Sequence, residues 1–283
     1  MDFPRNQILT SLLDVARADE RILGVIDYGS GGQGRADEWS DIDLVFVARN
    51  ESADDFQRNW RTWIARFGEL LLAYPGITGT PCAVFSTPWL PVRLDCTFYG
   101  EAKALVEIPK WEVKPARVEE MLLLDRSGGR LRACIEGLLQ NESAAVDIAH
   151  AFERTAGDFW YFTLRAAACL ARGQLWAERH NHQIIMDRLA GLVRLRTGTL
   201  KDWQKRPIFG LERDVPAEYL DALPDCFRLE TAQEIAASLR ASARLAATLC
   251  AEIAAMHQLD WPERLAAEVA SLLGKLDTGR AGG

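Results

Sequence analysis

The first part of the chain alternates short apolar runs with stretches of helical periodicity. Apolar residues recur at helical spacing over 8–18 and 53–72, which predicts two helices. Runs rich in β-branched and aromatic residues predict strands at 21–28, 42–48, 81–86 and 92–99, with a fifth candidate at 121–125. This alternation predicts an α+β domain built on a mixed β-sheet.

The second part has helical character almost throughout. Its Ala- and Leu-rich segments carry apolar residues three or four positions apart at 144–172, 175–196, 229–258 and 262–276. The predicted fold class is therefore α+β, with an N-terminal sheet domain over 1–140 followed by an all-α helical-bundle domain over 141–283.

Composition narrows the function classes. The net charge is −7, from 33 basic and 40 acidic residues, and this acidic balance argues against binding of bulk nucleic acid. None of the six cysteines forms a Cys-x-x-Cys pair, which favours reduced thiols over disulfides or a zinc site. The chain shows no apolar signal region and no apolar stretch near the ~20 residues that cross a bilayer, so we expect a cytoplasmic protein with no membrane partner.

The segment most informative about chemistry is 27–47, which reads DYGSGGQGRADEWSDIDLVFV. Gly29 and Ser30 directly follow a predicted strand, and a Gly-Ser turn lets backbone N–H groups approach an anion. Asp41 and Asp43 stand at the start of the next predicted strand. Because residues i and i+2 of a strand point the same way, the two carboxylates are expected to face together.

Paired carboxylates beside a phosphate-binding turn suit Mg²⁺, and two such ions about 3.5–4 Å apart would clamp an in-line displacement. Asp95 offers a third carboxylate, because a charge inside the apolar run 92–98 is costly unless it is paired or metal-bound. Each feature alone has a plain structural explanation, such as turn chemistry or an ion pair between Arg93 and Asp95. Their ordered combination favours a functional site.

The string GSGGQGRADEWSDIDL resembles the signature of the polymerase-beta-like nucleotidyltransferase superfamily, and it is most similar to the aminoglycoside and lincosamide nucleotidyltransferases of antibiotic resistance. The resemblance covers the N-terminal domain through Asp95 and 122–128, and it extends weakly into 158–180. It implies an enzyme that moves a nucleoside monophosphate from an NTP, expected to be ATP, onto a hydroxyl of a small molecule. Pyrophosphate would leave, and two Mg²⁺ ions are implied. The resemblance also implies that the domain over 1–140 binds the NTP and Mg²⁺ and that the helical domain over 141–283 binds the acceptor.

Residue by residue, the resemblance implies that Gly29 and Ser30 bind the NTP phosphates. Asp41 and Asp43 would hold Mg²⁺. Asp95 corresponds to an acidic residue that serves different members as a third metal ligand, as the general base, or as both, and Glu101 stands as a competing base.

Other residues of the signature have supporting roles. Gly34 and Ser40 match the motif and are expected to shape the loop. Gln33 stands where many members carry a basic residue, so the triphosphate charge must be met elsewhere, with Arg35 or a cation of the helical domain as candidates. His180 and His182 do not share a helix face, which argues against a metal pair, and we interpret them as surface or interdomain residues.

Several alternatives stay open. The acidic charge favours a cationic aminoglycoside, whereas the helical resemblance leans toward lincosamide-type enzymes. A regulatory nucleotide-binding module, a toxin–antitoxin-type partner or AMP transfer to a protein would also fit the signature. Two-domain members often complete the acceptor pocket with a second subunit, which leaves a homodimer open.

Overall fold

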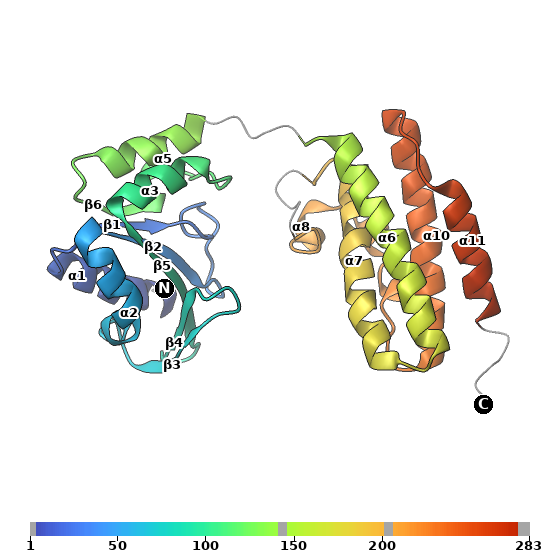
Figure 1. Ribbon diagram of the computed structural model, residues 1–283, viewed down its shortest axis with the longest axis horizontal. Helices are drawn as coiled ribbons and strands as arrows, with labels where there is room; N and C mark the ends of the chain where they lie inside the picture. Colours follow the sequence, from blue (N-terminus) through green and yellow to red (C-terminus); the bar gives the residue numbers. More distant parts are fainter. Residues whose placement is uncertain (1–3, 141–145, 201–205, 277–283) are drawn as a thin grey trace. The chain divides into compact units, whose positions relative to one another are not determined.

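The computed structural model describes residues 4–140, 146–200 and 206–276, and the chain divides into two compact units, Met1–Ser143 and Ala144–Gly283. The first unit holds a mixed six-stranded sheet with helices, and the second is helical (Figure 1). The predicted α+β fold class is confirmed. The predicted boundary after residue 140 adjoins the segment 141–145, which lies outside the described residues, and the functional division between the units stays a prediction.

The sheet of the first unit has the strand order β3-β4-β5-β2-β1-β6. Only β2 and β5 run parallel, and the other neighbouring pairs are antiparallel. The strands are β1 (Ile22–Asp27), β2 (Ile42–Ala48), β3 (Leu70–Pro75), β4 (Pro81–Phe85), β5 (Val92–Gly100) and β6 (Leu122–Asp125). The five predicted strands correspond to β1, β2, β4, β5 and β6.

Helices cover both faces of this sheet (Figure 1). Helices α1 (Pro4–Ala18) and α2 (Ala53–Ile64), the latter preceded by η1 (Asn50–Ser52), contribute to a core rich in aromatic rings on one face, where Phe46 and Phe56 both stack on Phe98. The opposite face packs against a smaller cluster. Its elements are α3 (Glu101–Glu107), η2 (Ile108–Lys110), α4 (Val118–Met121) and α5 (Arg130–Gln140).

The predicted helix over 53–72 is wrong in its second half. Helix α2 ends at Ile64, and the edge strand β3 begins at Leu70. Phe67 keeps the helical period and is buried although it lies in the turn after α2, which extends the apparent pattern. Strand β3 buries none of its residues, so it lacks the alternation that identifies a half-buried strand.

The second unit is a bundle of four long helices around one apolar core. Its helices are α6 (Ile148–Ala171), α7 (Leu175–Thr197), α10 (Ala232–His257) and α11 (Glu263–Lys275), with the short α8 (Leu211–Asp214), α9 (Ala217–Leu220) and η3 (Pro224–Cys226) between α7 and α10. All four long helices were predicted, although the first two residues of 144–172 lie outside the described residues. No helix in the described ranges has the length and apolar character needed to cross a bilayer.

The interpretation of His182 as a surface or interdomain residue is wrong. Its side chain is fully buried within the helical unit, where Nδ1 lies 3.0 Å from Glu178 Oε1 and Nε2 lies 2.8 Å from the carbonyl oxygen of Cys226. Position i−4 on α7 supplies the carboxylate, and η3 supplies the carbonyl. His182 therefore joins two elements of one unit.

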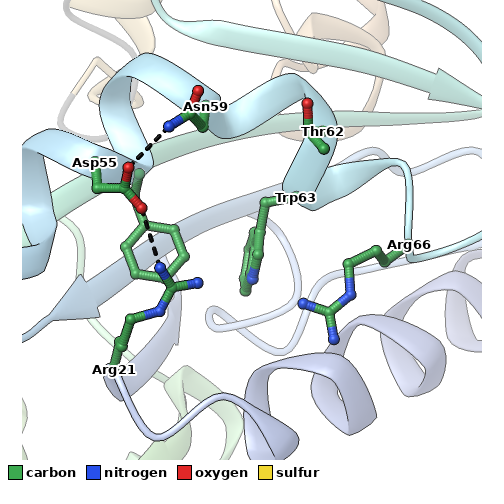
Figure 2. A pocket seen from close by; sticks show the side chains of 7 residues that line it. Arg21, Asp55, Asn59, Thr62, Trp63 and Arg66 are labelled. Carbon is green, nitrogen blue, oxygen red and sulfur yellow. Dashed lines mark hydrogen bonds and ion pairs between the residues drawn. The ribbon is translucent and has the colours of Figure 1, made fainter.

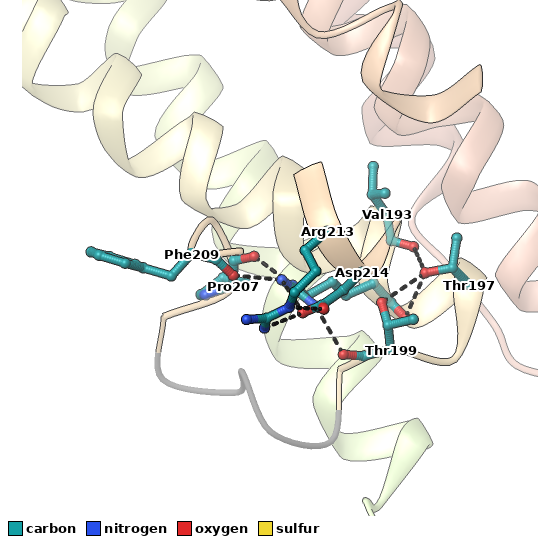
Figure 3. A network of polar contacts seen from close by, with 8 residues as sticks. Val193, Thr197, Thr199, Pro207, Phe209, Arg213 and Asp214 are labelled. Carbon is teal, nitrogen blue, oxygen red and sulfur yellow. Dashed lines mark hydrogen bonds and ion pairs between the residues drawn. The ribbon is translucent and has the colours of Figure 1, made fainter. Parts of the chain in front are cut away.

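A second buried polar residue, Arg194, organises the connection that follows α7. Its guanidinium is inaccessible to solvent and donates to the carbonyl oxygens of Thr199, Pro207 and Phe209, as well as to the carboxylate of Asp214. Figure 3 shows these acceptors gathered around one point beside the C-terminal end of α7. One side chain thus satisfies three backbone carbonyls that lie outside the long helices.

We predict that Arg194→Met lowers the free energy of unfolding of the helical unit by about 3–5 kcal/mol, since it leaves buried acceptors unpaired. The measurement is chemical denaturation followed by circular dichroism. The matched control is Arg213→Met, because Arg213 also pairs with Asp214 but is 60% exposed, and its loss should leave the transition nearly unchanged. Equal effects of the two variants would contradict this account of the connection.

Candidate active site

The predicted site residues gather at one edge of the sheet. Strand β1 ends there at Asp27, and β2 begins there at Ile42, because the two strands are antiparallel. The parallel partner β5 begins at the same edge, with Asp95 directly opposite Asp43. The register thus makes neighbours of carboxylates that lie far apart in the sequence.

The Gly-Ser turn after β1 leaves backbone donors open. The N–H groups of Gln33, Gly34 and Arg35 close the turn on the carbonyls of Gly29, Gly31 and Ser30 respectively. Within the described residues, the N–H groups of Ser30, Gly31 and Gly32 donate to no acceptor. The hydroxyl of Ser30 is buried and also lacks a partner there. Three open N–H groups and one hydroxyl in a tight turn match the needs of a phosphate group.

The glycines of this turn are required by close approach. A Cβ on Gly29 would collide with the carboxylate of Asp43, and a Cβ on Gly32 would collide with the backbone carbonyl of Asp27. At Gly31 the obstacle is the ion pair between Asp27 and Arg5. The turn therefore packs directly on the carboxylates with no room for side chains.

That ion pair is buried on the far side of the turn. Arg5, near the start of α1, places Nη2 2.6 Å from Asp27 Oδ2, and both side chains are almost inaccessible to solvent. The other oxygen of Asp27 accepts the N–H of Gly29 at 3.1 Å, and Arg5 Nε donates to the backbone carbonyl of Asp41 at 3.1 Å. One ion pair thus positions both the turn and the segment that enters β2.

Asp43 is held in a strongly unfavourable environment for a charge. Burial raises the pKa of its carboxyl to about 7, repulsion from Asp41, Asp95 and Asp27 adds to the shift, and Arg5 opposes it. Burial and the neighbouring carboxylates thus both disfavour the charged form of Asp43. A cation bound among them would offset that repulsion.

Asp41 differs from Asp43 because a cation already accompanies it. Arg93 places Nη2 3.3 Å from Asp41 Oδ2, and both side chains are accessible. The alternative pairing of Arg93 with Asp95, considered from the sequence, does not occur among the ion pairs of the described residues. Arg93 is thus an accessible basic group beside the carboxylates.

The side chains at the sheet edge are of the kinds that bind a divalent cation, but they are not arranged as a complete metal site. Carboxylate oxygens, such as those of the opposed pair Asp43 and Asp95, are the hard ligands that Mg²⁺ prefers. The Ser30 hydroxyl, which has no partner in the described residues, belongs to the turn whose Gly29 packs on Asp43. In the described residues no three acidic, histidine or cysteine side chains form a group ready to hold a metal ion. Asp41, which pairs with Arg93, would be the third carboxylate of such a group.

The loop between the turn and β2 is held by local bonds. Gly34 has a left-handed φ of 66°, where glycine is favoured, and the Arg35 guanidinium donates to the side chain of Gln33. Ser40 Oγ donates to Asp37 Oδ1 at 2.8 Å and accepts the N–H of Asp37. These contacts agree with loop-shaping roles for Gly34 and Ser40, while nucleotide binding by Arg35 stays a prediction.

Two further residues of the site were not identified from the sequence. Tyr28 lies across from Asp43 at the end of β1, where its N–H donates to the Asp43 carbonyl at 3.1 Å, and its ring lies 5.9 Å from that of Trp111. Burial and then the charges of Asp43 and Asp95 raise the pKa of the Tyr28 hydroxyl, so it stays protonated. Arg5 was missed as well, because no local sequence pattern in α1 indicates that Arg5 pairs with Asp27 at the end of β1.

Glu101, the competing candidate for general base, lies at the wrong end of β5. It follows the last residue of that strand, six positions beyond Asp95 and so roughly 20 Å away along an extended chain. There it pairs with Arg130 at 2.6 Å. Asp95 is therefore the better-placed candidate.

A cavity of about 220 Å³ lies against α2, on the face opposite the carboxylates. Figure 2 shows its lining, in which Arg21 pairs with Asp55 at 3.0 Å, while the Arg21 guanidinium lies 4.5 Å from the ring centre of Phe56. Trp63 donates its indole N–H to Asp19. None of the predicted site residues lines this cavity.

The family model described as streptomycin adenylyltransferase matches residues 4–81 and 114–276. Among solved structures, the chain is similar to an aminoglycoside 6-adenyltransferase from Bacillus subtilis, at 15% identity over 96% of this chain and 98% of that one, with a TM-score of 0.45. It is also similar to a nucleotidyltransferase-like protein from Exiguobacterium sibiricum 255-15, at 15% identity over 96% of this chain and 89% of that one, with a TM-score of 0.32. No curated protein sequence matches the chain.

We predict that Arg5→Met destabilises the first unit by about 3–5 kcal/mol, because it leaves the Asp27 carboxylate buried without its cation. Urea denaturation of the full chain measures the change. Arg17→Met serves as the control, since Arg17 lies on the same helix in an exposed pair with Asp14. Indistinguishable midpoints for the two variants would show that the buried pair does not hold the turn.

A second prediction concerns Asp43, whose folded-state pKa lies above its ordinary value of 3.8. Its contribution to stability is present below pH 3.8 and is lost as the pH rises toward about 7, because the folded chain must then bury a charge. Asp43→Asn removes that penalty. In EDTA, thermal unfolding at pH 5, 6, 7 and 8 should show an advantage of the variant that grows with pH and levels off above about 7. An advantage independent of pH, or a loss of stability, would contradict the prediction.

Proposed function

The chain belongs to the streptomycin adenylyltransferase family, and we propose on that basis that it transfers AMP from ATP to a hydroxyl of a small cationic acceptor of the aminoglycoside class. The main support for the proposal is that N–H groups of the turn after β1 have no acceptor among the described residues and lie at the same sheet edge as the opposed pair Asp43 and Asp95. A donor-lined turn next to clustered carboxylates suits a metal-bound triphosphate better than any neutral ligand.

The turn would hold the phosphates. The open N–H groups of Ser30, Gly31 and Gly32 can donate to phosphate oxygens, as can the unpartnered Ser30 hydroxyl. Gln33 brings no positive charge to this turn. Arg93, which lies beside Asp41 and is accessible, would meet part of the triphosphate charge, with Arg35 as a second candidate.

Asp41, Asp43 and Asp95 would hold Mg²⁺, which when bound would neutralise the phosphate oxygens and lower the pKa of the acceptor hydroxyl. The chain itself supplies the ligands and their spacing. Asp43 and Asp95 lie opposite each other on adjacent strands, and neighbouring strands are about 4.8 Å apart. One bound ion could therefore contact both carboxylates.

In the proposed reaction the acceptor hydroxyl oxygen attacks the α-phosphorus of ATP. A bond forms between that oxygen and phosphorus, the bond from the α-phosphorus to the bridging oxygen breaks, and pyrophosphate leaves. The hydroxyl proton passes to a carboxylate, for which Asp95 is the best-placed group. Positioning and electrostatic stabilisation of the phosphoryl oxygens supply most of the rate in transfers of this type.

The choice of an aminoglycoside-like acceptor rests on the family and on charge. The family description names streptomycin, a polycationic molecule, which favours the aminoglycoside over the lincosamide alternative. The net charge of −7 suits a cationic acceptor. The described residues of the helical unit lie within the second matched segment, and the proposal includes acceptor binding by this unit.

The test is pyrophosphate release from ATP and Mg²⁺ across a panel of aminoglycosides and lincosamides. We expect release that depends on an aminoglycoside and falls at least a hundredfold in Asp41→Asn and in Asp95→Asn, because ligands and base are lost. Arg17→Met, far from the sheet edge on α1, is the active control. Nucleotide binding without release for any acceptor would favour a regulatory module, and label transferred to a protein would favour AMP transfer to a protein.

A further inference from the structure

Two large aromatic side chains, Trp39 and Trp89, meet in solvent near the carboxylates. Their ring centroids lie 6.0 Å apart with an interplanar angle of 89°, and the residues are 64% and 54% exposed. Indole rings bury a large apolar area when they pack into a core, so a contacting pair that remains this exposed marks a contact site for another molecule.

The strand register places this pair at the site. Trp39 precedes Asp41 by two residues, and Trp89 lies in the connection that leads into β5. Because β2 and β5 are parallel, with Ile42 opposite Leu94, the residues just before each strand share one edge of the sheet. The ring pair therefore stands at the edge that carries the carboxylates.

The side of the site on which the pair lies follows from the strand order. Strands β1, β2, β5 and β4 succeed one another across the sheet, with the phosphate turn after β1 and Trp89 between β4 and β5. In an in-line displacement the attacking oxygen and the leaving pyrophosphate lie on opposite sides of the phosphorus. With pyrophosphate near the turn, the acceptor approaches from the side of Trp89.

The surroundings of the pair are negatively charged. Asp37 and Glu38 are both exposed in the turn that carries Trp39. Asp37 Oδ1 accepts the N–H of Trp39 at 3.0 Å and the hydroxyl of Ser40 at 2.8 Å, so the turn is fixed by its own bonds. The bond from Ser40 is the main cause of a lowered pKa for Asp37, which stays ionised. Aromatic faces next to carboxylates favour ammonium and guanidinium groups.

We propose that Trp39 and Trp89 form an acceptor subsite that binds an amine- or guanidine-bearing ring against the exposed surfaces of the two contacting indoles, with the negative charges of Asp37 and Glu38 nearby favouring its cations. The proposal rests on the proposed function and narrows it, since it states which residues select the acceptor. Trp89 and Arg93 both lie in 82–113, between the two segments matched by the family model. Half of the subsite thus comes from a part of the chain that the family description does not cover.

The experiment compares Trp39→Ala and Trp89→Ala with Trp39→Phe and Trp89→Phe in the full chain. Removing an aromatic face should raise the KM for the acceptor about tenfold or more, whereas the phenylalanine variants keep most of the affinity. The KM for ATP should change less than twofold. Ile77→Ala is the control, because Ile77 is a fully exposed apolar side chain in the turn between β3 and β4 of the same unit.

Equilibrium titration with streptomycin and kanamycin, without ATP, separates this proposal from the proposed function. If the wild type binds one of them and the alanine variants do not, the subsite is supported even where no AMP is transferred. Binding by the alanine variants equal to that of the wild type, or no binding by the wild type, overturns it. A rise in the KM for ATP with an unchanged KM for the acceptor would overturn it too, because the rings would then serve the adenine base.

Discussion

The buried ion pair between Arg5 and Asp27 supports the whole candidate active site from beneath. Asp27 ends β1 and accepts the N–H of Gly29, while Arg5 reaches the backbone carbonyl of Asp41. The pair fills the space under the turn, which is why Gly31 cannot carry a side chain. A residue near the start of the chain thus determines both where the phosphate donors lie and where the carboxylates of β2 begin.

The clustering of the site's carboxylates destabilises the folded protein, because like charges repel one another at the sheet edge. Repulsion at Asp43 is not relieved by Arg93, which pairs with Asp41 instead. Such an arrangement persists because the surrounding sheet is packed on both faces by helices and aromatic rings. The strong packing holds charges in positions that are useful only when a cation or a cationic ligand arrives.

The sequence predicts much of this structure because its strongest signals are local. The runs at 42–48 and 92–99 become β2 and β5, and the four long helices of the second unit follow from their periodicity. Long-range pairing explains what could not be predicted. The partner of Arg93 and the contact between Trp39 and Trp89 depend on the parallel register of β2 and β5, which no local pattern encodes. The functional roles of Asp41, Asp43 and Asp95 stay predictions.

The parallel pairing of β2 with β5 also has a consequence for the order of folding. These strands are separated by α2 and the β3–β4 hairpin, so their contact closes a long loop and is expected late. Until it forms, Asp43 and Asp95 remain hydrated and apart, and their repulsion costs nothing. The electrostatic cost of the site therefore arises in the closing step, and a ligand that neutralises the carboxylates would favour completion of the fold as well as catalysis.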